Sequence, residues 1–463
     1  MSERLPSGVP GLDEVLGGGL PANAINLIVG LPGTGKTLLA QQYLFENATI
    51  DRPAVYLTTI SEPLDKIVRY GQTLGFFDPD AVGRSVFFED LGAALLRDGV
   101  RAALERVEQI INQREPEMLV IDSFKPLAVF ADSRQEYRRF LHELAVRVSI
   151  RPLHNLWLGE YTATDIATAP EFAIADAVIW LTSIRYEQRE IRQLQVLKLR
   201  GSGFPSGRHS YRLTAEGMSV FPRLADPAEQ VDYKSETNRV SSGVKSLDGV
   251  LGRGYRAGSS TLVIGPSGAG KTVLGMHFAL AGAREGDTTV FATFDENPSQ
   301  LAAAAASFRW SFDAPEIHLV YRSAVDLHLD EWVYELLERV ESGGVRRVFI
   351  DGVANLRAAA QDPTRFQEYL YSLVQRFARN AVTFMMSLES PELFAPSRLT
   401  DVPLSQIADN VLLLQFLRRD GEYRRALTVL KSRGAKTEPR LSEYTIGSNG
   451  IELSQPGGST RIR

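Results

Sequence analysis

The stretch GLPGTGKT at residues 30–37 matches G-x-x-x-x-G-K-[S/T], the pattern of a phosphate-binding P-loop, and GPSGAGKT at residues 265–272 matches it again. Each copy follows an apolar run, INLIV or STLVI, and precedes a segment with helical character, LLAQQYLFENA or VLGMHFALAGA. A strand, a glycine-rich turn and a helix start form the context that this motif requires. The sequence therefore predicts two nucleotide sites in one chain.

The residue types of each P-loop suit a nucleotide with its magnesium ion. Glycines let backbone N–H groups point at phosphate oxygens, and the helix N-terminus adds partial positive charge. The lysine is expected to reach the β- and γ-phosphates, and the final threonine to place its hydroxyl on Mg²⁺. The expected nucleotide-binding residues are Gly30, Leu31, Pro32, Gly33, Thr34, Gly35, Lys36 and Thr37, and then Gly265, Pro266, Ser267, Gly268, Ala269, Gly270, Lys271 and Thr272.

The likeness between the two halves extends well beyond the P-loops. SGVPGLDEVLGGGLPA at residues 7–22 aligns without a gap with SGVKSLDGVLGRGYRA, whose residue numbers are higher by 235. LVIDS, IADAVIWL and VLKLRGS recur in the same order as VFIDG, IADNVLLL and VLKSRGA. This pattern indicates a tandem duplication of a whole domain. We expect domains at residues 1–224 and 242–453, a polar linker at 225–241 and a short tail at 454–463.

Within each half, apolar runs alternate with helical patterns. In the first half, residues 55–58, 119–121, 155–158 and 177–181 are predicted strands, and residues 101–113 and 135–148 are predicted helices. This alternation predicts an α/β fold with a mainly parallel sheet flanked by helices. Ligands in such sheets bind at the carboxyl ends of the strands, where both P-loops fall.

The composition excludes several classes of function. The chain has 463 residues and a net charge of −5, which gives no support for a large nucleic-acid-binding face. It contains 0 cysteines, which excludes disulfides, thiolate zinc sites and cysteine nucleophiles. No apolar run approaches the length of a membrane span, and the N-terminus lacks the apolar segment of a signal peptide. We therefore expect a cytoplasmic protein with no membrane partner.

Two aspartates, Asp122 and Asp351, each end an apolar strand downstream of a P-loop. A carboxylate in this place can hold Mg²⁺ opposite the P-loop hydroxyl. The metal site predicted in each half is thus Thr37 with Asp122, or Thr272 with Asp351.

The halves differ where hydrolysis needs a group that orients or deprotonates water. In the second half, FATFDENP places Asp295 and Glu296 just after a strand, which suits a catalytic base. In the first half, YLTTISEP has Ile60 and Ser61 at the equivalent positions. Glu62 is one position late, and a slip of one residue turns a strand-end side chain to the other side. We therefore interpret Glu62 as a solvated carboxylate, although rescue of hydrolysis by Glu62 remains an alternative.

Two pairs of cations, Lys198 with Arg200 and Lys431 with Arg433, lie two residues apart on predicted strands. Alternation points both members of a pair to one side of the strand. Such a pair could bind a γ-phosphate on a neighbouring subunit. The alternative is a solvated strand face, against which the recurrence in both halves argues.

The SGVPGLDEVLGGGLP opening, the P-loops, the acidic pair and the K-x-R-G elements together resemble the KaiC family, the tandem ATPases of the cyanobacterial clock and their prokaryotic relatives. The resemblance covers nearly the whole chain. It implies RecA-like domains, a double-ring hexamer, and ATP at subunit interfaces with both cation pairs acting across them. It also implies a signalling or regulatory role, with a KaiB-like or other protein partner.

The sequence departs from the family pattern at three places. The family has paired acids in both halves, whereas this chain has them only in the second. The family phosphorylates an adjacent serine and threonine, where this chain has Ser405 followed by Gln406. The chain ends in SQPGGSTRIR soon after Leu453, so we expect the tail that binds the clock's activating partner to be missing. Our hypothesis is a one-site autokinase switch on Ser405, with Thr400 as a secondary acceptor; the alternative is that Ser405 only caps or packs its segment.

Two functions of other classes compete with a KaiC-like ATPase. A DNA-directed RecA-like motor or recombinase would share the P-loop chemistry, and stimulation of ATP hydrolysis by DNA would identify it. A non-catalytic scaffold would assemble on ATP and present a partner surface. Asp295 and Glu296 argue against a fully inactive enzyme, and a turnover assay separates these functions.

Overall fold

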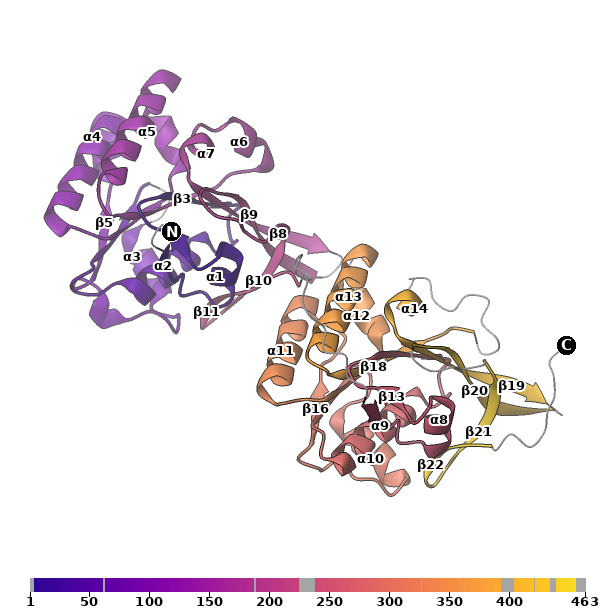
Figure 1. Cartoon of the computed structure of the whole chain (residues 1–463). Helices are drawn as coiled ribbons and strands as arrows, with labels where there is room; N and C mark the ends of the chain where they lie inside the picture. The colour runs from indigo at the N-terminus through magenta and orange to yellow at the C-terminus, as the bar shows by residue number, and fades with distance from the viewer. Residues whose placement is uncertain are drawn as a thin grey trace. The chain divides into compact units, whose positions relative to one another are not determined.

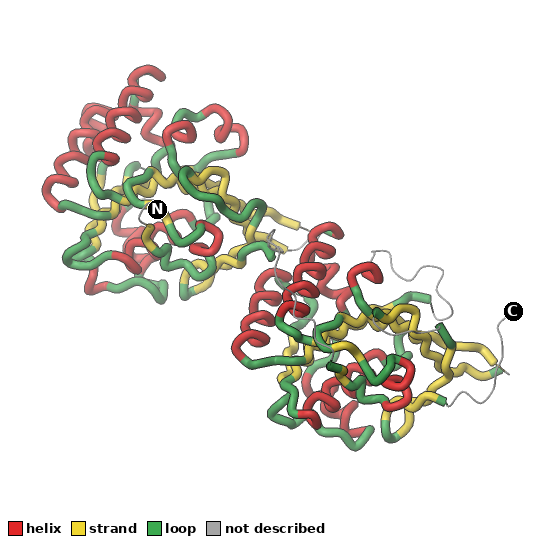
Figure 2. The backbone as a smooth tube through the Cα atoms, viewed as in Figure 1, coloured by secondary structure: helices red, strands yellow, loops and turns green. Residues whose placement is uncertain are grey.

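The computed structural model describes residues 4–60, 63–186, 189–224, 238–325, 327–360, 362–392, 404–419, 421–433 and 439–454. Ser61, Glu62, Thr400, residues 225–237 of the expected linker and residues 455–463 of the tail lie outside these ranges. The chain divides into two compact units, Met1–Arg223 and Leu224–Arg463. Each unit is an α/β domain with a central sheet (Figures 1 and 2). Leu224 is buried in the core of the second unit.

The described residues of the first unit form the elements that follow, in chain order. They are β1 (Arg4–Leu5), α1 (Leu12–Leu16), β2 (Leu20–Pro21), β3 (Ile25–Gly30), α2 (Lys36–Asn47), β4 (Ala54–Thr58), α3 (Leu64–Gly71), η1 (Pro79–Ala81), β5 (Val86–Asp90), α4 (Gly92–Arg114), β6 (Met118–Asp122), η2 (Lys125–Phe130), α5 (Arg134–Ser149), β7 (His154–Gly159), α6 (Ala163–Thr168), α7 (Glu171–Ile174), β8 (Ala177–Tyr186), β9 (Arg189–Leu199), β10 (His209–Thr214) and β11 (Gly217–Phe221).

Among the described residues of this unit, one sheet has nine strands in the order β11-β10-β9-β8-β3-β7-β6-β4-β5. The strands from β8 to β5 pair in parallel, whereas β9, β10 and β11 continue the sheet antiparallel. Strand β3, which leads into the P-loop, is therefore central. The P-loop therefore starts at the end of a buried strand that has a neighbouring strand, β8 or β7, on each side.

The side chains of β3 alternate between two cores, one on each face of the sheet. Ile28 packs with residues of α1 and α2, whereas Leu27 and Val29 pack with residues of α4 and α5. The helices lie on both sides of the sheet in Figure 1. Because both faces are covered, the central strands are mostly apolar rather than alternating in polarity, although Asn26 of β3 and Asn155 of β7 are buried polar residues.

The described residues of the second unit repeat this plan. Its elements are β12 (Arg239–Val240), α8 (Lys245–Val250), β13 (Tyr255–Arg256), β14 (Ser260–Gly265), α9 (Lys271–Glu285), β15 (Thr289–Thr293), α10 (Pro298–Ser307), β16 (Ile317–Tyr321), α11 (Leu329–Ser342), β17 (Arg347–Asp351), α12 (Val353–Ala360), α13 (Pro363–Arg379), β18 (Thr383–Glu389), α14 (Leu404–Ile407), β19 (Asn410–Arg419), β20 (Glu422–Ser432), β21 (Leu441–Gly447) and β22 (Gly450–Leu453).

The nine-stranded sheet that these described residues form has the order β16-β15-β17-β18-β14-β19-β20-β21-β22. Strand β14 lies at its centre, as β3 does in the first unit. Leu262 and Ile264 of β14 pack with α11, α12 and α13, and Val263 packs with α8, α9 and α10 on the other face.

The predicted fold class is confirmed. The four strands and two helices expected in the first half correspond to β4, β6, β7, β8, α4 and α5. The predicted helix at 101–113 is only the second part of α4, because Asp98 and Gly99 interrupt the helical backbone. Within the described part of the chain, no helix is long and apolar enough to cross a membrane.

At one buried contact between the P-loop helix and a strand, the two units use side chains of different size. A Cβ added to Gly275 on α9 would lie 2.1 Å from the ring of Phe349 on β17. At the matching places the first unit has Ala40 and Val120, which are also buried. A glycine thus makes room for an aromatic ring in the second unit.

We expect Gly275→Ala to lower the free energy of unfolding by about 1–3 kcal/mol, because the added methyl overpacks the core. Adding Phe349→Val should recover much of that loss, since this pair restores the volumes of the first unit. Denaturant unfolding of the four proteins of the double-mutant cycle measures the coupling. Additive effects of the two substitutions would contradict this account of the contact.

Candidate functional site

In both units the P-loop forms a tight turn between its strand and helix. Gly33 and Gly35 have φ angles of 77° and 89°, and Gly268 and Gly270 have 76° and 95°. These left-handed conformations are strained for residues with a side chain. Turns that contain such residues direct successive backbone N–H groups into a concave anion site. The geometry is that of a phosphate-binding turn in each unit.

The P-loop lysines fold back over these turns. Lys36 Nζ donates to the carbonyl oxygens of Gly30 and Leu31, both at 3.0 Å. Lys271 Nζ donates to Gly265 at 2.9 Å and to Pro266 at 3.0 Å. Burial lowers the pKa of each lysine, and nearby carboxylates partly offset this effect. Each ammonium group is thus held at the turn that would receive the phosphates.

Two further side chains hold each turn, and neither was predicted from the sequence. In the first unit, the hydroxyl of Tyr211 on β10 donates to the carbonyl oxygen of Thr34 at 2.7 Å. Arg192 on β9 donates to the carbonyl oxygen of Gly33, also at 2.7 Å. The antiparallel strands β9 and β10 therefore fix the outer side of the P-loop.

The second unit has the same arrangement. Tyr444 on β21 donates to the carbonyl oxygen of Ala269, and Arg425 on β20 donates to that of Gly268 at 3.1 Å. Because equivalent contacts occur in both units, they are a common feature of the two P-loop sites.

Each P-loop threonine contacts the predicted strand-end aspartate. Thr37 Oγ1 donates to Asp122 Oδ2 at 2.7 Å, and Thr272 Oγ1 donates to Asp351 Oδ2 at 2.6 Å. Mg²⁺ prefers such oxygen ligands and usually takes one or two carboxylates together with phosphate and water. A hydroxyl and a carboxylate in contact beside the phosphate turn therefore fit this ion in both units.

The two aspartates are oriented by different neighbours. Asp122 also accepts a hydrogen bond from the buried hydroxyl of Tyr56 at 2.5 Å, and Asp351 from that of Ser387. Burial raises the pKa of Asp351, although hydrogen bonds from Ser387 and Thr272 oppose the shift. Each of these hydrogen bonds fixes the orientation of its carboxylate, which the sequence could not predict.

The acidic pair of the second unit separates into two environments. Asp295 is exposed, and both of its carboxylate oxygens accept from the amide of Asn355 at 3.2 Å. Glu296 is half-buried, and its Oε2 has no hydrogen-bond partner among the described residues. Burial raises the pKa of Glu296, and the charges of Asp351 and Asp295 raise it further. Glu296 therefore has a free carboxylate oxygen near the metal-site aspartate.

The first unit offers no acid at the first of these two positions. Ile60 follows β4 there and is 47% exposed. Ser61 and Glu62 lie outside the described residues, so the role of Glu62 stays a prediction.

A third carboxylate occurs beside each P-loop and was missed in the sequence. Glu160 directly follows β7, and Glu389 ends β18; both strands pair with the P-loop strand. Each is the carboxylate that most favours the charged form of its P-loop lysine, Lys36 or Lys271. The two glutamates end the equivalent segments LWLGE and MMSLE, so an alignment of the two halves would have identified them.

The cation pair of the first unit lies away from its own P-loop. Lys198 pairs across the sheet with Val178, which pairs with Leu27, three residues before Gly30. Three residues of a strand span about 10 Å. Arg200 lies beyond the end of β9, where its guanidinium contacts Asp176 at 3.2 Å. The pair is therefore near the amino end of β3, whereas the P-loop is at the carboxyl end.

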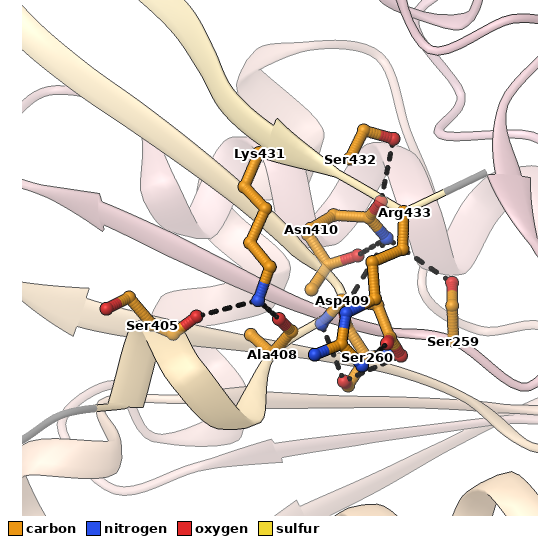
Figure 3. A network of polar contacts seen from close by, with 10 residues as sticks. Ser259, Ser260, Ser405, Ala408, Asp409, Asn410, Lys431, Ser432 and Arg433 are labelled. Atoms are coloured by element: carbon orange, nitrogen blue, oxygen red, sulfur yellow. Dashed lines mark hydrogen bonds and ion pairs between the residues drawn. The ribbon is translucent and has the colours of Figure 1, made fainter. Parts of the chain in front are cut away.

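Figure 3 shows the corresponding pair of the second unit. Lys431 Nζ donates to the carbonyl oxygens of Ser405 at 3.0 Å and of Ala408 at 2.6 Å, and Arg433 pairs with Asp409 at 3.3 Å. The hydroxyl of Ser405 points away from Lys431 in this view. The predicted phosphorylation site thus lies on α14, directly beside the cation pair; Thr400 lies outside the described residues.

With this geometry established, comparisons with known proteins give the family. A family model described as "ATPase: KaiC" matches residues 5–225 and again residues 240–457. The chain belongs to the KaiC family of ATPases. The resemblance of the sequence motifs to this family is thereby confirmed.

Several curated proteins align with this KaiC-family chain over nearly its whole length. "Circadian clock oscillator protein KaiC" of Picosynechococcus sp. is 26% identical over 97% of this chain and 89% of that protein. The protein of the same name from Rippkaea orientalis is 26% identical over 96% of this chain and 87% of its own length. That of Prochlorococcus marinus (strain SARG) is 27% identical over 97% and 92%.

Proposed function

We propose that this KaiC-family protein binds ATP with Mg²⁺ at both P-loops and hydrolyses ATP mainly in its second unit. The observation that carries the proposal is the different surroundings of two equivalent sites. Both have the phosphate turn, the lysine and the threonine–aspartate pair. Glu296, with its unpartnered oxygen near Asp351, has no equivalent among the described residues of the first unit.

The residues divide the work as follows. The P-loop amides and lysine bind phosphates, and threonine with aspartate would hold Mg²⁺, which neutralises charge that develops on the phosphate oxygens. Glu296 accepts a proton from the attacking water, a role for which its free oxygen suits it. Asp295 is instead engaged by Asn355 and acts through its charge on Glu296. The first unit binds ATP and serves mainly in assembly.

Substitution of the two acids tests this assignment. Glu296→Gln should reduce turnover on the order of 10²–10⁴-fold in the second unit, the usual effect of losing a positioned base. The double variant Asp295→Asn with Glu296→Gln should then remove most of the protein's steady-state ATPase activity. Asp313→Asn, an exposed acid of the same unit, is the control. A double variant that keeps most of the wild-type rate would refute the assignment.

The same assignment predicts a pH dependence. A base works only when ionised, and a raised pKa keeps Glu296 protonated to higher pH than an ordinary glutamate. Turnover should therefore decline on the acid side at a higher pH than it would for an exposed carboxylate. Asp295→Asn removes one negative neighbour, lowers that pKa and should move the acid limb to lower pH. An unshifted pH profile of kcat would contradict the coupling.

We further propose that the protein assembles as a double-ring hexamer in which Lys198, Arg200, Lys431 and Arg433 act on the neighbouring subunit's nucleotide. Their location at the amino ends of the central strands supports this, because a P-loop of the same unit lies at the opposite ends. A signalling role with a KaiB-like or other protein partner belongs to the same proposal, supported by the clock relatives.

Light scattering tests the assembly. With ATP and Mg²⁺ the wild-type chain should form hexamers, and Lys198→Ala with Arg200→Ala should need at least about ten-fold more ATP, since charge-assisted hydrogen bonds contribute roughly 1.5–3 kcal/mol each. Arg101→Ala, which removes an exposed cation of α4, is the control. Monomers alone with the wild-type protein would reject the hexamer. Addition of DNA should leave turnover unchanged.

An autokinase activity on Ser405 is the last part of the proposal. Lys431 binds the carbonyl oxygen of Ser405, so assembly through that lysine would bring Ser405 close to the neighbour's γ-phosphate, and a change of its side-chain rotamer would turn the hydroxyl toward that phosphate. Gln406 cannot accept a phosphoryl group, which leaves a one-site switch, with Thr400 as the secondary acceptor. Incubation with ATP and Mg²⁺ followed by peptide mass spectrometry should find phosphoserine 405, and Lys431→Ala should abolish it. Unmodified Ser405 and Thr400 in protein that hydrolyses ATP would leave an ATPase without kinase activity.

A further inference from the structure

A buried carboxylate lies at the start of the short helix α7 in the first unit. Glu171 is 2% exposed, and its Oε1 accepts hydrogen bonds from Tyr137 at 2.5 Å and from Tyr161 at 3.0 Å. Its Oε2 has no hydrogen-bond partner among the described residues. Burial and the nearby Glu171 raise the pKa of both tyrosines. Both hydroxyls therefore stay protonated and act as donors, which fixes the direction of the network.

The residues that follow Glu171 hold the cation pair. Lys198 Nζ donates to the carbonyl oxygens of Phe172 at 3.2 Å and Ala173 at 3.3 Å. Arg200 donates to Ala173 as well, at 3.3 Å. The position of α7 thus sets the position of both cations, and Glu171 ties α7 to α5 through Tyr137.

The second donor, Tyr161, lies just after the end of β7. It directly follows Glu160, the carboxylate that acts most strongly on the P-loop Lys36. Along the chain the network therefore comes close to Glu160, while the hydroxyl of Tyr161 is directed to Glu171.

At the equivalent position the second unit has an uncharged side chain. The offset of 233 residues that pairs Lys198 with Lys431 pairs Glu171 with Leu404, which is 1% exposed in an apolar core. Lys431 is nevertheless held by the carbonyl oxygens of Ser405, on α14, and of Ala408, which directly follows it. Leucine is thus sufficient to anchor the helix. Burying a carboxylate costs more free energy than burying a leucine, and the two tyrosine hydrogen bonds restrict the orientation of Glu171 more narrowly than an apolar contact would.

We propose that Glu171 is a positioning residue which, with Tyr137 and Tyr161, aligns Lys198 and Arg200 for the neighbouring subunit's nucleotide in the first ring. This inference rests on the proposed action of that pair across the interface. It predicts that the network affects assembly and not nucleotide binding to the chain's own P-loop.

The decisive variant is Glu171→Leu, which installs the residue of the second unit. Two quantities are measured, the affinity of the dilute monomer for a fluorescent ATP analogue with Mg²⁺ and the ATP concentration for half-maximal assembly. We expect the first to stay within about two-fold and the second to rise about ten-fold, since losing two hydrogen bonds to a carboxylate corresponds to at least one decade. Tyr43→Phe, which removes a buried hydroxyl without a hydrogen-bond partner in the described structure, should change neither.

Two further comparisons make the test specific. Combined with Lys198→Ala, Glu171→Leu should add little to the single lysine variant, because both act through the same cation. Glu171→Gln should retain much of the wild-type assembly, because its amide oxygen still accepts from both tyrosines. Additive effects, or a glutamine variant no better than leucine, would indicate a merely structural role and overturn the inference.

The outcomes also separate this inference from the proposed function. Assembly of Glu171→Leu at the wild-type ATP concentration, with Lys198→Ala impaired, overturns the positioning role alone. Wild-type behaviour of Lys198→Ala overturns the action across the interface and the positioning role with it. If Glu171→Leu melts below the assay temperature, Tyr161→Phe replaces it, for which a clear rise in the ATP concentration for half-maximal assembly supports the inference and no rise overturns it.

Discussion

The hydrogen bond from the P-loop threonine to the strand-end aspartate is the contact on which each nucleotide site depends. It joins the first turn of α2 to β6 across the intervening strand β7, and the same contact joins α9 to β17. Because the strands are parallel, their carboxyl ends lie at one edge, and the phosphate turn, lysine and carboxylates gather there. A metal ion bound at this place would meet ligands that the fold already holds together.

Both copies of the domain keep the phosphate turn, the lysine and the threonine–aspartate contact, but the groups around them differ. Tyr56 on β4 orients Asp122, whereas Ser387 on β18 orients Asp351. The equivalent aspartates of the two units are therefore held by hydroxyl groups from strands that do not correspond. The acidic pair, by contrast, has no replacement among the described residues at the position of Ile60. Within the described residues, both units have the threonine–aspartate contact but only the second has the acidic pair, which is the basis of our proposal that one unit turns over ATP and the other serves assembly.

The sequence predicted what lies close along the chain or repeats as a motif. The P-loops, the strand-end aspartates and the alternation of strands and helices were all readable in this way, and the fold class was confirmed. The contacts of Tyr211 and Tyr444 were not predicted, because they depend on antiparallel strands that return to the P-loop from 177 or 175 residues away. Glu171 was missed for a related reason. A lone glutamate before an apolar segment gives no sign that two distant tyrosines will enclose it.

Strand β9 contacts the P-loop near one end and carries Lys198 near the other. Arg192 and Lys198 are six residues apart, which is roughly 20 Å of extended chain, and a one-residue bulge opposite Val178 and Ile179 lies between them. A hydrogen-bonded strand resists stretching, so a small displacement of the phosphate turn is passed along its length rather than absorbed. In the ring that we propose, each β9 would connect one nucleotide site to the next, and the bulge would be the point at which the strand can bend.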